Sequence, residues 1–357
     1  MVRVAMVTWG DRYISWVRVA KLFCERLREL DIPCRLVDAE CEPKIGSDEA
    51  PVLVPVDWVA WNYPYSFARI VGRAARSCGF VSIDADDLGP VAVAAMRSVH
   101  RVMVTFSHGV EIVGRYVPPQ RVDVVHLPID DDLIEMVDDP ESYSDRPWMR
   151  RVLSLPRPRI MIVAHHDVKR KNIDVALRAL AKVVSENDRV SIVIKKWSVG
   201  YLPTDLSLSD RTAVVSEFVS DEEMVALYKA VDLVVVPSGG GSAELPAVEA
   251  AACGTPVITS TWFSFLEYLP EAPKVPISSW ESVEGDVHSK AVTAGRIGRV
   301  DPDVLAGMII NVVSDIEEMK RYFERCAPEI RRRWSYRRVT DNELLEVLER
   351  HVFPYMG

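Results

Sequence analysis

The chain has a single glutamine, Gln120, among its 357 residues, and asparagine is also scarce. Arginine far outnumbers lysine. Proteins from hot environments avoid thermolabile amide side chains and favour charged ones. The composition therefore favours a thermophilic source.

Long hydrophobic runs are missing as well. No apolar stretch approaches the roughly 18 residues that a membrane span needs, and Met1–Val7 enters a strand pattern at once, which predicts no signal peptide. The cysteines are scattered and form no CxxC pair: Cys24, Cys34, Cys41, Cys78, Cys253 and Cys326. Because a chain of this length does not need disulfides to fold, we expect reduced thiols and a cytoplasmic protein.

An excess of positive charge is also absent. The formal net charge is −9, which excludes the overall basic footprint of a nucleic-acid-binding protein. Hydrophobic residues make up 48% and charged residues 27% of the chain, as in ordinary globular proteins. A length of 357 residues predicts about two domains.

Short apolar runs alternate with segments of helical periodicity, which predicts two doubly wound α/β domains with parallel sheets. In the first series we expect strands at 2–8, 32–37, 58–61, 80–83, 102–106 and 122–127, and helices at 17–30, 66–78 and 90–99. The proline-rich segment 138–158 reads as a linker. In the second series we expect strands at 159–164, 190–194, 213–215 and 233–236, helices at 172–184 and 221–230, and closing helices at 301–315, 316–333 and 339–350.

The most informative stretch is Pro237–Ser260, which reads as a glycine-rich loop, a helix and a strand after the apolar run 233–236. Glycines let a backbone approach a ligand closely, and a helix N-terminus presents unpaired N–H groups to an anion. Pro246 suits the first helical turn, and Gly254 suits the helix end. This pattern is typical of a site for nucleotide phosphates and ribose.

This stretch resembles the donor-binding loop of retaining glycosyltransferases of the GT-B fold, the family-4-like group. The matching residues are Leu245, Pro246, Glu249, Ala250, Ala252, Gly254, Pro256 and Val257. The resemblance implies that Glu249 holds ribose and that Gly239, Gly240, Gly241, Ser242 and Leu245 line the donor site. The chain departs from the family where its first acid would fall on Gly241, whereas Glu244 stands at a family glycine. Glu244 is the candidate substitute for that acid.

Three consecutive cations, Lys169, Arg170 and Lys171, precede the helix expected at 172–184. A helix dipole disfavours cations at its N-terminus, so this run suggests an anionic ligand; a solvated helix start is the alternative. The resemblance places Lys171 and His166 on the pair that clamps the donor diphosphate, with Lys169 or Arg170 as a further charge. Cations here replace a metal, so no metal and no cofactor is implied.

The remaining candidates follow from the same resemblance. Val219 would lie beside the nucleobase, and Gly10 near the diphosphate. On the acceptor side, Asp84, Asp86 and His108 follow expected strands of the first domain, and for His108 a structural loop role is the favoured interpretation.

Together these features predict residues 1–150 as the acceptor-side domain, 151–335 as the nucleotide-sugar domain, and 336–357 as a helix returning to the first domain. The implied activity is metal-independent sugar transfer with retention, from a nucleotide diphosphate sugar to a sugar or lipid-linked acceptor. A non-catalytic binding subunit and a GT-B epimerase or phosphorylase stay open as alternatives. Arginines at 69, 73 and 76 form a stripe that either is solvated or contacts anionic lipid at the inner membrane face.

Overall fold

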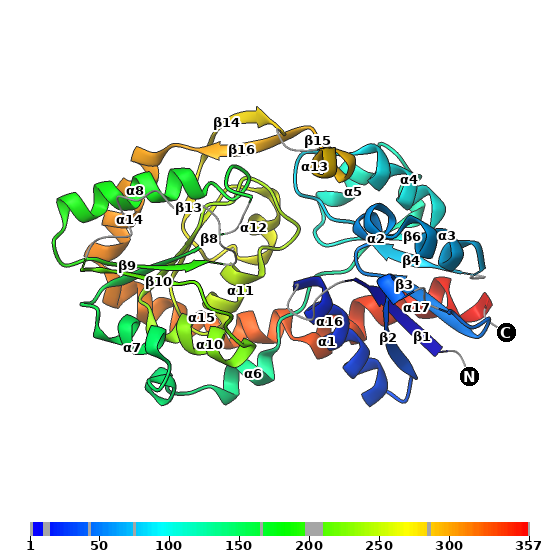
Figure 1. The fold of residues 1–357 in the computed structure, drawn as a ribbon, viewed down its shortest axis with the longest axis horizontal. Coiled ribbons are helices and arrows are strands. Elements are labelled where there is room, and N and C mark those ends of the chain that lie inside the picture. Colours follow the sequence, from blue (N-terminus) through cyan, green and yellow to red (C-terminus); the bar gives the residue numbers. More distant parts are fainter. Residues whose placement is uncertain are drawn as a thin grey trace.

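The computed structural model describes residues 3–9, 15–41, 44–73, 76–164, 167–196, 210–283 and 287–355. It contains two six-stranded parallel sheets, each flanked by helices (Figure 1). We call the part built on the first sheet the N-terminal unit and the part built on the second sheet the C-terminal unit. This confirms the expected α/β fold class.

The first sheet has the order β2-β1-β3-β4-β6-β7. Its strands are β1 (Arg3–Thr8), β2 (Cys34–Asp38), β3 (Glu49–Leu53), β4 (Cys78–Phe80), β6 (Arg101–Val104) and β7 (Val122–Val124). Strand β1 lies between β2 and β3 with Val4 opposite Cys34 and Ala50, and five of its six residues are buried. Such near-continuous burial is what a parallel strand covered on both faces requires.

The second sheet has the order β10-β9-β8-β11-β12-β13. Its strands are β8 (Arg159–Ala164), β9 (Ser191–Lys196), β10 (Thr212–Val215), β11 (Leu233–Val236), β12 (Val257–Ser260) and β13 (Lys274–Val275). The predicted bounds of β8 and β11 are confirmed to the residue. Both are apolar runs bounded by polar or turn residues, which is the clearest strand signal.

One expected strand is wrong. The run 58–61 lies inside helix α2 (Val56–Asn62), and the strand in this region is β3, nine residues earlier. Helix α2 buries Val56 and Val59, which are three residues apart and therefore share a helix face. Strand β3 reads Glu-Ala-Pro-Val-Leu, and its acid and proline hide the apolar pattern although all five residues are buried.

The helices expected from the periodic segments are present with small shifts of their ends, and the structure adds several short helices that were not expected. In the N-terminal unit the other helices are α1 (Ser15–Glu29), α3 (Pro64–Arg73), α4 (Pro90–Ser98) and α5 (Gly109–Val113), while α6 (Asp131–Met136) packs on the C-terminal unit. In the C-terminal unit they are α7 (Pro147–Ser154), α8 (Ile173–Glu186), α10 (Asp221–Ala230), α11 (Leu245–Ala252), α12 (Phe263–Tyr268), α13 (Val287–Val292), α14 (Pro302–Ser314) and α15 (Ile316–Trp334). Ser220 caps α10 in a capping box with Glu223. None of the helices described is both long and apolar enough to cross a bilayer.

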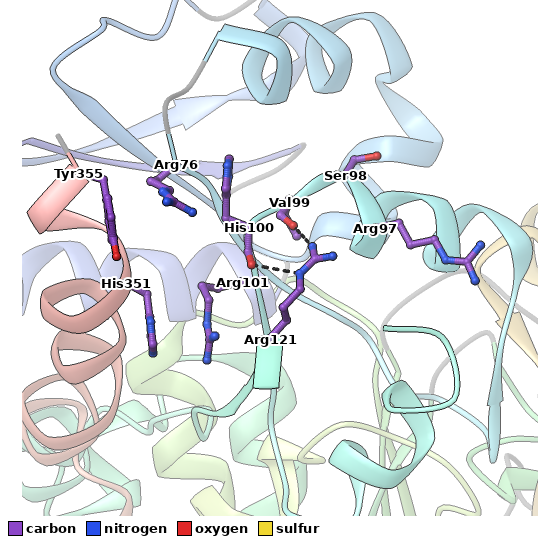
Figure 2. Close-up of a pocket in the computed structure, with 9 residues that line it drawn as sticks. All are labelled: Arg76, Arg97, Ser98, Val99, His100, Arg101, Arg121, His351 and Tyr355. Carbon is purple, nitrogen blue, oxygen red and sulfur yellow. Dashed lines mark hydrogen bonds between the residues drawn. The ribbon is translucent and has the colours of Figure 1, made fainter. Parts of the chain in front are cut away.

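The chain crosses between the units at two neighbouring places. Ile129 forms a parallel bridge with Ser335: its N–H donates to the carbonyl of Trp334 at 2.9 Å, and the N–H of Tyr336 donates to its carbonyl at 3.2 Å. After this point α16 (Tyr336–Val339), a π-helical turn (Thr340–Leu344) and α17 (Leu345–His351) return to the N-terminal unit, where α16 packs against α1. Figure 2 shows the end of this segment facing the N-terminal sheet. The domain boundaries at 150 and 335 stay a prediction.

A second connection lies on the far side of the molecule. Strands β14 (Ile277–Ser282) and β16 (Arg296–Val300) form an antiparallel ribbon that leaves the C-terminal unit (Figure 1). Beyond the ribbon, α13 packs against α2 and α4, and β15 (Thr293–Ala294) pairs with β5 (Asp87–Leu88) of the N-terminal unit. We call residues 277–300, of which 284–286 lie outside the description, the bridging arm.

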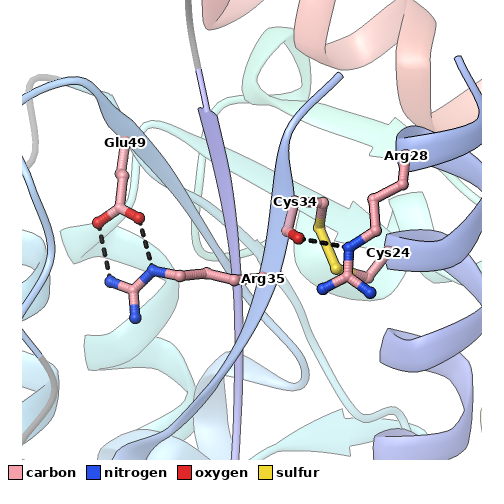
Figure 3. The surroundings of a disulfide bond; sticks show 5 residues. All are labelled: Cys24, Arg28, Cys34, Arg35 and Glu49. Carbon is pink, nitrogen blue, oxygen red and sulfur yellow. Dashed lines mark hydrogen bonds and ion pairs between the residues drawn. A yellow bond between two sulfur atoms is a disulfide. The ribbon is translucent and has the colours of Figure 1, made fainter. Parts of the chain in front are cut away.

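The expectation that all cysteines are reduced is wrong for two of them. Cys24 on α1 and Cys34 at the start of β2 form a disulfide, with their Cα atoms 5.3 Å apart (Figure 3). A short turn joins α1 to β2 and brings these positions within bridging range, which spacing along the sequence does not reveal. The other four are free: Cys78 is buried, Cys253 and Cys326 are half-buried, and Cys41 is exposed.

Candidate functional site

Lys171 and Glu244 form the centre of the candidate site. Lys171 lies in the turn before α8, and Glu244 is the N-cap residue of α11. The Lys171 ammonium donates to both carboxylate oxygens of Glu244, and an Arg170 guanidinium nitrogen lies 3.4 Å from Oε1. The Glu244 side chain is only 3% exposed, so this contact is a buried ion pair that also connects the two loops.

The conformation at Gly241 explains why this chain has no acid there. Gly241 has φ +148°, which favours glycine, and a Cβ at this position would lie 2.1 Å from Oε1 of Glu244. Glu244 itself has φ +54°, a left-handed conformation that is uncommon for a residue with a side chain. The Glu244 carboxylate therefore fills the space that a side chain at 241 would enter.

Arg170 connects this cluster to the N-terminal unit. Its guanidinium lies 3.2 Å from Oδ1 of Asp84, pairs with Asp167, and donates to the carbonyl of Gly240 at 3.0 Å. Burial would lower the pKa of Arg170, but the surrounding carboxylates, Asp84 first, raise it above its usual value. Burial raises the pKa of Asp84 although Arg170 opposes this effect. Burial also lowers the pKa of Lys171, with Glu244 opposing.

The glycine-rich loop packs directly against the N-terminal unit. The Ser242 hydroxyl accepts from the Ile83 N–H at 3.0 Å, and its carbonyl accepts from the Thr105 hydroxyl at 2.9 Å. A Cβ at Gly240 would lie 2.0 Å from the Asp84 carbonyl oxygen, so only glycine permits this approach. The structure thus brings the loop against the carboxyl ends of β4 and β6.

Glu249 lies one turn inside α11 and is buried. One of its oxygens accepts from Arg18 of α1 at 3.1 Å, and the other accepts from the Tyr228 hydroxyl at 3.0 Å. Arg18 also pairs with Asp221 at 3.0 Å. Both Glu249 oxygens are therefore engaged, one of them by the opposite unit.

Other predicted residues lie elsewhere along the interface between the units. The Asp86 carboxylate accepts from the backbone N–H of Arg296 in the bridging arm at 2.5 Å and from its guanidinium at 3.0 Å. His108 stacks on Phe263 with ring centroids 3.9 Å apart. Both are contacts between the units rather than parts of the Lys171 cluster.

The last predicted residues flank this cluster or fall outside the description. Leu245 is buried at the start of α11, and Val219 is half-buried before α10. Lys169 shares the turn of Lys171, and its carbonyl accepts from Arg299. Gly10 and His166 lie outside the described residues. The described ranges hold no group of three or more His, Cys, Asp or Glu side chains placed to bind a metal ion.

Sequence reasoning missed two residues that face this interface. Arg18 lies in the amphipathic pattern of α1 as one charge among several, so nothing marks it as the partner of Glu249. Asp57 directly precedes the run 58–61 that was expected to be a strand, and burial raises its pKa to about 8. An acid inside an apolar run is the one signal that singles out Asp57 in the sequence.

Comparisons with known proteins agree with this geometry. Residues 157–272, which include β8, the Lys171 turn and α11, match the family model of glycosyl transferases group 1. This part of the chain is therefore similar to the group 1 glycosyltransferases.

Curated relatives that match this chain include two D-inositol 3-phosphate glycosyltransferases. That of Mycobacterium sp. (strain KMS) is 34% identical over 149 residues, which is 40% of this chain and 32% of the relative. That of Mycolicibacterium gilvum (strain PYR-GCK) is 27% identical over 262 residues, 69% of this chain and 57% of the relative. The matches thus span between about a third and just over half of the length of these relatives.

Solved structures resemble this chain over nearly its whole length. HepE of Anabaena, whose structure contains UDP and glucose, superposes with a TM-score of 0.66 at 14% identity, covering 98% of this chain and 100% of HepE. Sucrose-phosphate synthase of Thermosynechococcus elongatus gives 0.67 at 15% identity, covering 99% and 100%. At such low identity the likeness concerns the fold, and it confirms the GT-B arrangement of two Rossmann-like units.

Proposed function

We propose that this protein transfers a sugar from a nucleotide diphosphate sugar to an acceptor hydroxyl, with retention and without a metal. The bond from the anomeric carbon to the diphosphate breaks, and the diphosphate leaves with the electron pair. The acceptor oxygen bonds to the same face of the anomeric carbon, and its proton passes to the leaving diphosphate.

In this proposal the cations stabilise the charge that grows on the diphosphate as it leaves. Lys171 and Arg170 would bind it, with His166 and Lys169 in the same loop. A cation held in a buried site interacts more strongly with this charge than it would in water. Glu244 would contact the donor sugar in place of the missing acid at 241, and Glu249 would hold ribose.

The observation that carries the proposal is the position of the Glu244 carboxylate. It fills the space beside Gly241 and binds Lys171 and Arg170, so an acid and two cations meet at the start of α11. Asp84 approaches the same cluster from the N-terminal unit, where the acceptor would bind. The acceptor is proposed as a sugar or lipid-linked hydroxyl compound, and D-inositol 3-phosphate, named for the relatives, is the first soluble candidate.

The test is a transfer assay with a panel of nucleotide sugars on matched lysine variants. Lys171→Ala should lower kcat by about a hundredfold or more and raise the donor KM less, because the charge on the leaving oxygen is larger in the transition state than in the ground state. Lys182→Ala is the control, since Lys182 is exposed on α8, the helix that follows Lys171, and pairs with Asp303.

Two outcomes would contradict this assignment. Full kcat in Lys171→Ala would remove Lys171 from the site. Donor binding without any transfer in the wild type, lost in Lys171→Ala, would instead identify a non-catalytic binding subunit.

Metal independence has its own test. Turnover should be unchanged after dialysis against excess chelator, because protein cations serve the leaving group. Activity that disappears with EDTA and returns with magnesium or manganese would contradict the proposal and direct attention to Asp84 and Asp86.

A further inference from the structure

A cavity of about 440 Å³ lies in the N-terminal unit, away from the interface with the C-terminal unit. It lies near the starts of β4 and β6 and is lined there by residues 76 and 97–101. The candidate site lies at the opposite, carboxyl ends of the same strands, near Ile83 and Thr105. The C-terminal segment closes the cavity with His351 and Tyr355 (Figure 2).

The lining of this cavity is strongly basic. No aspartate or glutamate belongs to it, whereas four arginines and two histidines do. They are Arg76, Arg97, Arg101, Arg121, His100 and His351. In a protein with net charge −9, such a concentration of basic side chains in one cavity runs against the overall composition.

Only one of the four arginines has a carboxylate partner among the described residues. Arg101 forms a two-bond ion pair with Asp123 at 2.6 and 2.8 Å. Arg121 donates to the carbonyl oxygens that follow α4, those of Val99 and His100 among them, and so is fixed without being neutralised. Since a carbonyl dipole does not cancel a full charge, the cavity keeps an excess of positive charge.

Arg76 is held in place by an aromatic ring rather than by an acid. Its guanidinium carbon lies 4.1 Å from the centroid of the Tyr355 ring, a cation–π contact. This contact covers one face of the guanidinium, while its N–H groups lie in the plane and stay able to donate. In Figure 2, Arg76 lies between Tyr355 and His100.

His100 presents a hydrogen-bond donor to the same space. Its Nδ1 accepts from the Ser77 N–H at 3.1 Å, so the proton of the neutral ring is on Nε2. Among the described residues, Nε2 has no hydrogen-bond partner. Burial lowers the pKa of His100, and the charges of Arg76 and Arg121 lower it further, as expected where positive charge is not compensated.

We propose that this cavity binds the phosphate group of a phosphorylated ligand, through Arg76, His100 and His351. A phosphate dianion accepts several charge-assisted hydrogen bonds, and planar guanidinium groups match its oxygens. A volume of about 440 Å³ is larger than a phosphate needs and leaves room for the rest of a small metabolite or a lipid headgroup. The ligand would connect α17 and Tyr355 to the N-terminal sheet. This inference does not depend on the proposed sugar transfer.

Calorimetric titration with pyrophosphate and with inorganic phosphate tests the proposal on matched variants. Arg76→Gln should raise the Kd of pyrophosphate at the cavity by about tenfold or more, which is the usual loss for a hydrogen bond to a charged group. Arg73→Gln is the control, since Arg73 is exposed on α3 and does not line the cavity. Lys171→Ala removes binding at the donor site, and in this variant pyrophosphate should still bind in the cavity.

A second measurement locates the ligand without any substitution. Pyrophosphate should slow amide hydrogen exchange in residues 345–355, because a ligand held by His351 stabilises the segment that carries it. Vesicles of phosphatidylcholine with and without phosphatidic acid distinguish the source of the phosphate. Arg76-dependent binding to free phosphates alone indicates a soluble ligand, and Arg76-dependent sedimentation with phosphatidic acid indicates a lipid headgroup. Equal affinities in the two glutamine variants, together with unchanged exchange at 345–355, would overturn the proposal.

Discussion

Burial raises the pKa of the Asp57 carboxyl well above its usual value. Its Oδ1 accepts from the Ser82 N–H at 3.1 Å, and its Oδ2 has no partner among the described residues. Full burial, the largest cause, raises the pKa of Asp57 to about 8, and the nearby charge of Asp84 adds to this effect. The side chain is therefore protonated in the folded protein at neutral pH, and a protonated oxygen can donate where a carboxylate cannot.

Asp57→Asn should remove a pH dependence of the folding free energy. Between about pH 4 and pH 8 the folded state keeps the Asp57 proton and the unfolded state releases it, so wild-type stability falls as pH rises, by at most about 1.4 kcal/mol per pH unit from this group. Urea unfolding at several pH values measures the slope. Asp138→Asn, on the exposed chain after α6, should keep the wild-type slope, and identical slopes in both variants would show that Asp57 is ionised at neutral pH.

At the scale of elements, the sequence predicted those helices and strands whose signals lie within a few neighbouring residues. The strands β8 and β11 and helix α10 came out with correct bounds, because an apolar run or a capping box is complete within a few residues. Strand β3 and helix α2 did not, since Pro51 and the acids in this region break the periodicities that the prediction uses.

The candidate site also has a part that the sequence predicts and a part that only the packed structure reveals. The basic turn at Lys171 and the start of α11 follow from sequence, because each is a loop joined to a helix start. Their partners do not. Arg18 and Glu249 are 231 positions apart, and only the packing of the two units brings them to 3.1 Å. The role of Glu244 depended on a left-handed backbone conformation that its residue type disfavours.

Packing of the glycine-rich loop against the bridging arm gives a prediction for this element. A Cβ at Gly239 would lie 1.6 Å from the Gly298 carbonyl oxygen, while the Gly298 N–H donates to the Gly239 carbonyl at 2.7 Å. Gly239→Ala should lower the free energy of unfolding by about 1–3 kcal/mol, as overpacking does. Gly307→Ala in α14, where a Cβ meets nothing within 4 Å, should be neutral or stabilising by up to about 1 kcal/mol. Chemical denaturation compares the two, and equal stabilities would contradict the close approach.

At the scale of the whole molecule, His126 joins three parts of the chain. It follows β7, and its ring nitrogens lie 2.6 Å from Glu267 of α12 and 2.9 Å from Glu343 of the returning segment. Burial alone would lower the pKa of His126, but the two carboxylates outweigh it and raise the pKa to about 9. The ring is therefore a cation at neutral pH that holds both units and the C-terminal segment together.

His126→Gln should lower the free energy of unfolding, and the loss should be largest below pH 6.5. The charged ring contributes its full stabilisation below the unfolded pKa of about 6.5, and this contribution disappears as pH rises through the folded value of about 9. The difference in melting temperature between wild type and variant should thus shrink between pH 6.5 and pH 9. A difference that stays constant over this interval would mean that the ring acts through packing alone.

The bridging arm has a mechanical consequence for any opening of the two units. Both chain crossings lie together at Ile129 and Ser335, which suits a hinge, whereas the β15–β5 contact lies on the opposite side of the molecule (Figure 1). A rotation about that hinge has its longest lever at the arm, so even a small angle pulls β15 away from β5. Opening therefore requires this two-residue pairing to break, in addition to the contacts that Arg18, Arg170 and Ser242 make between the units.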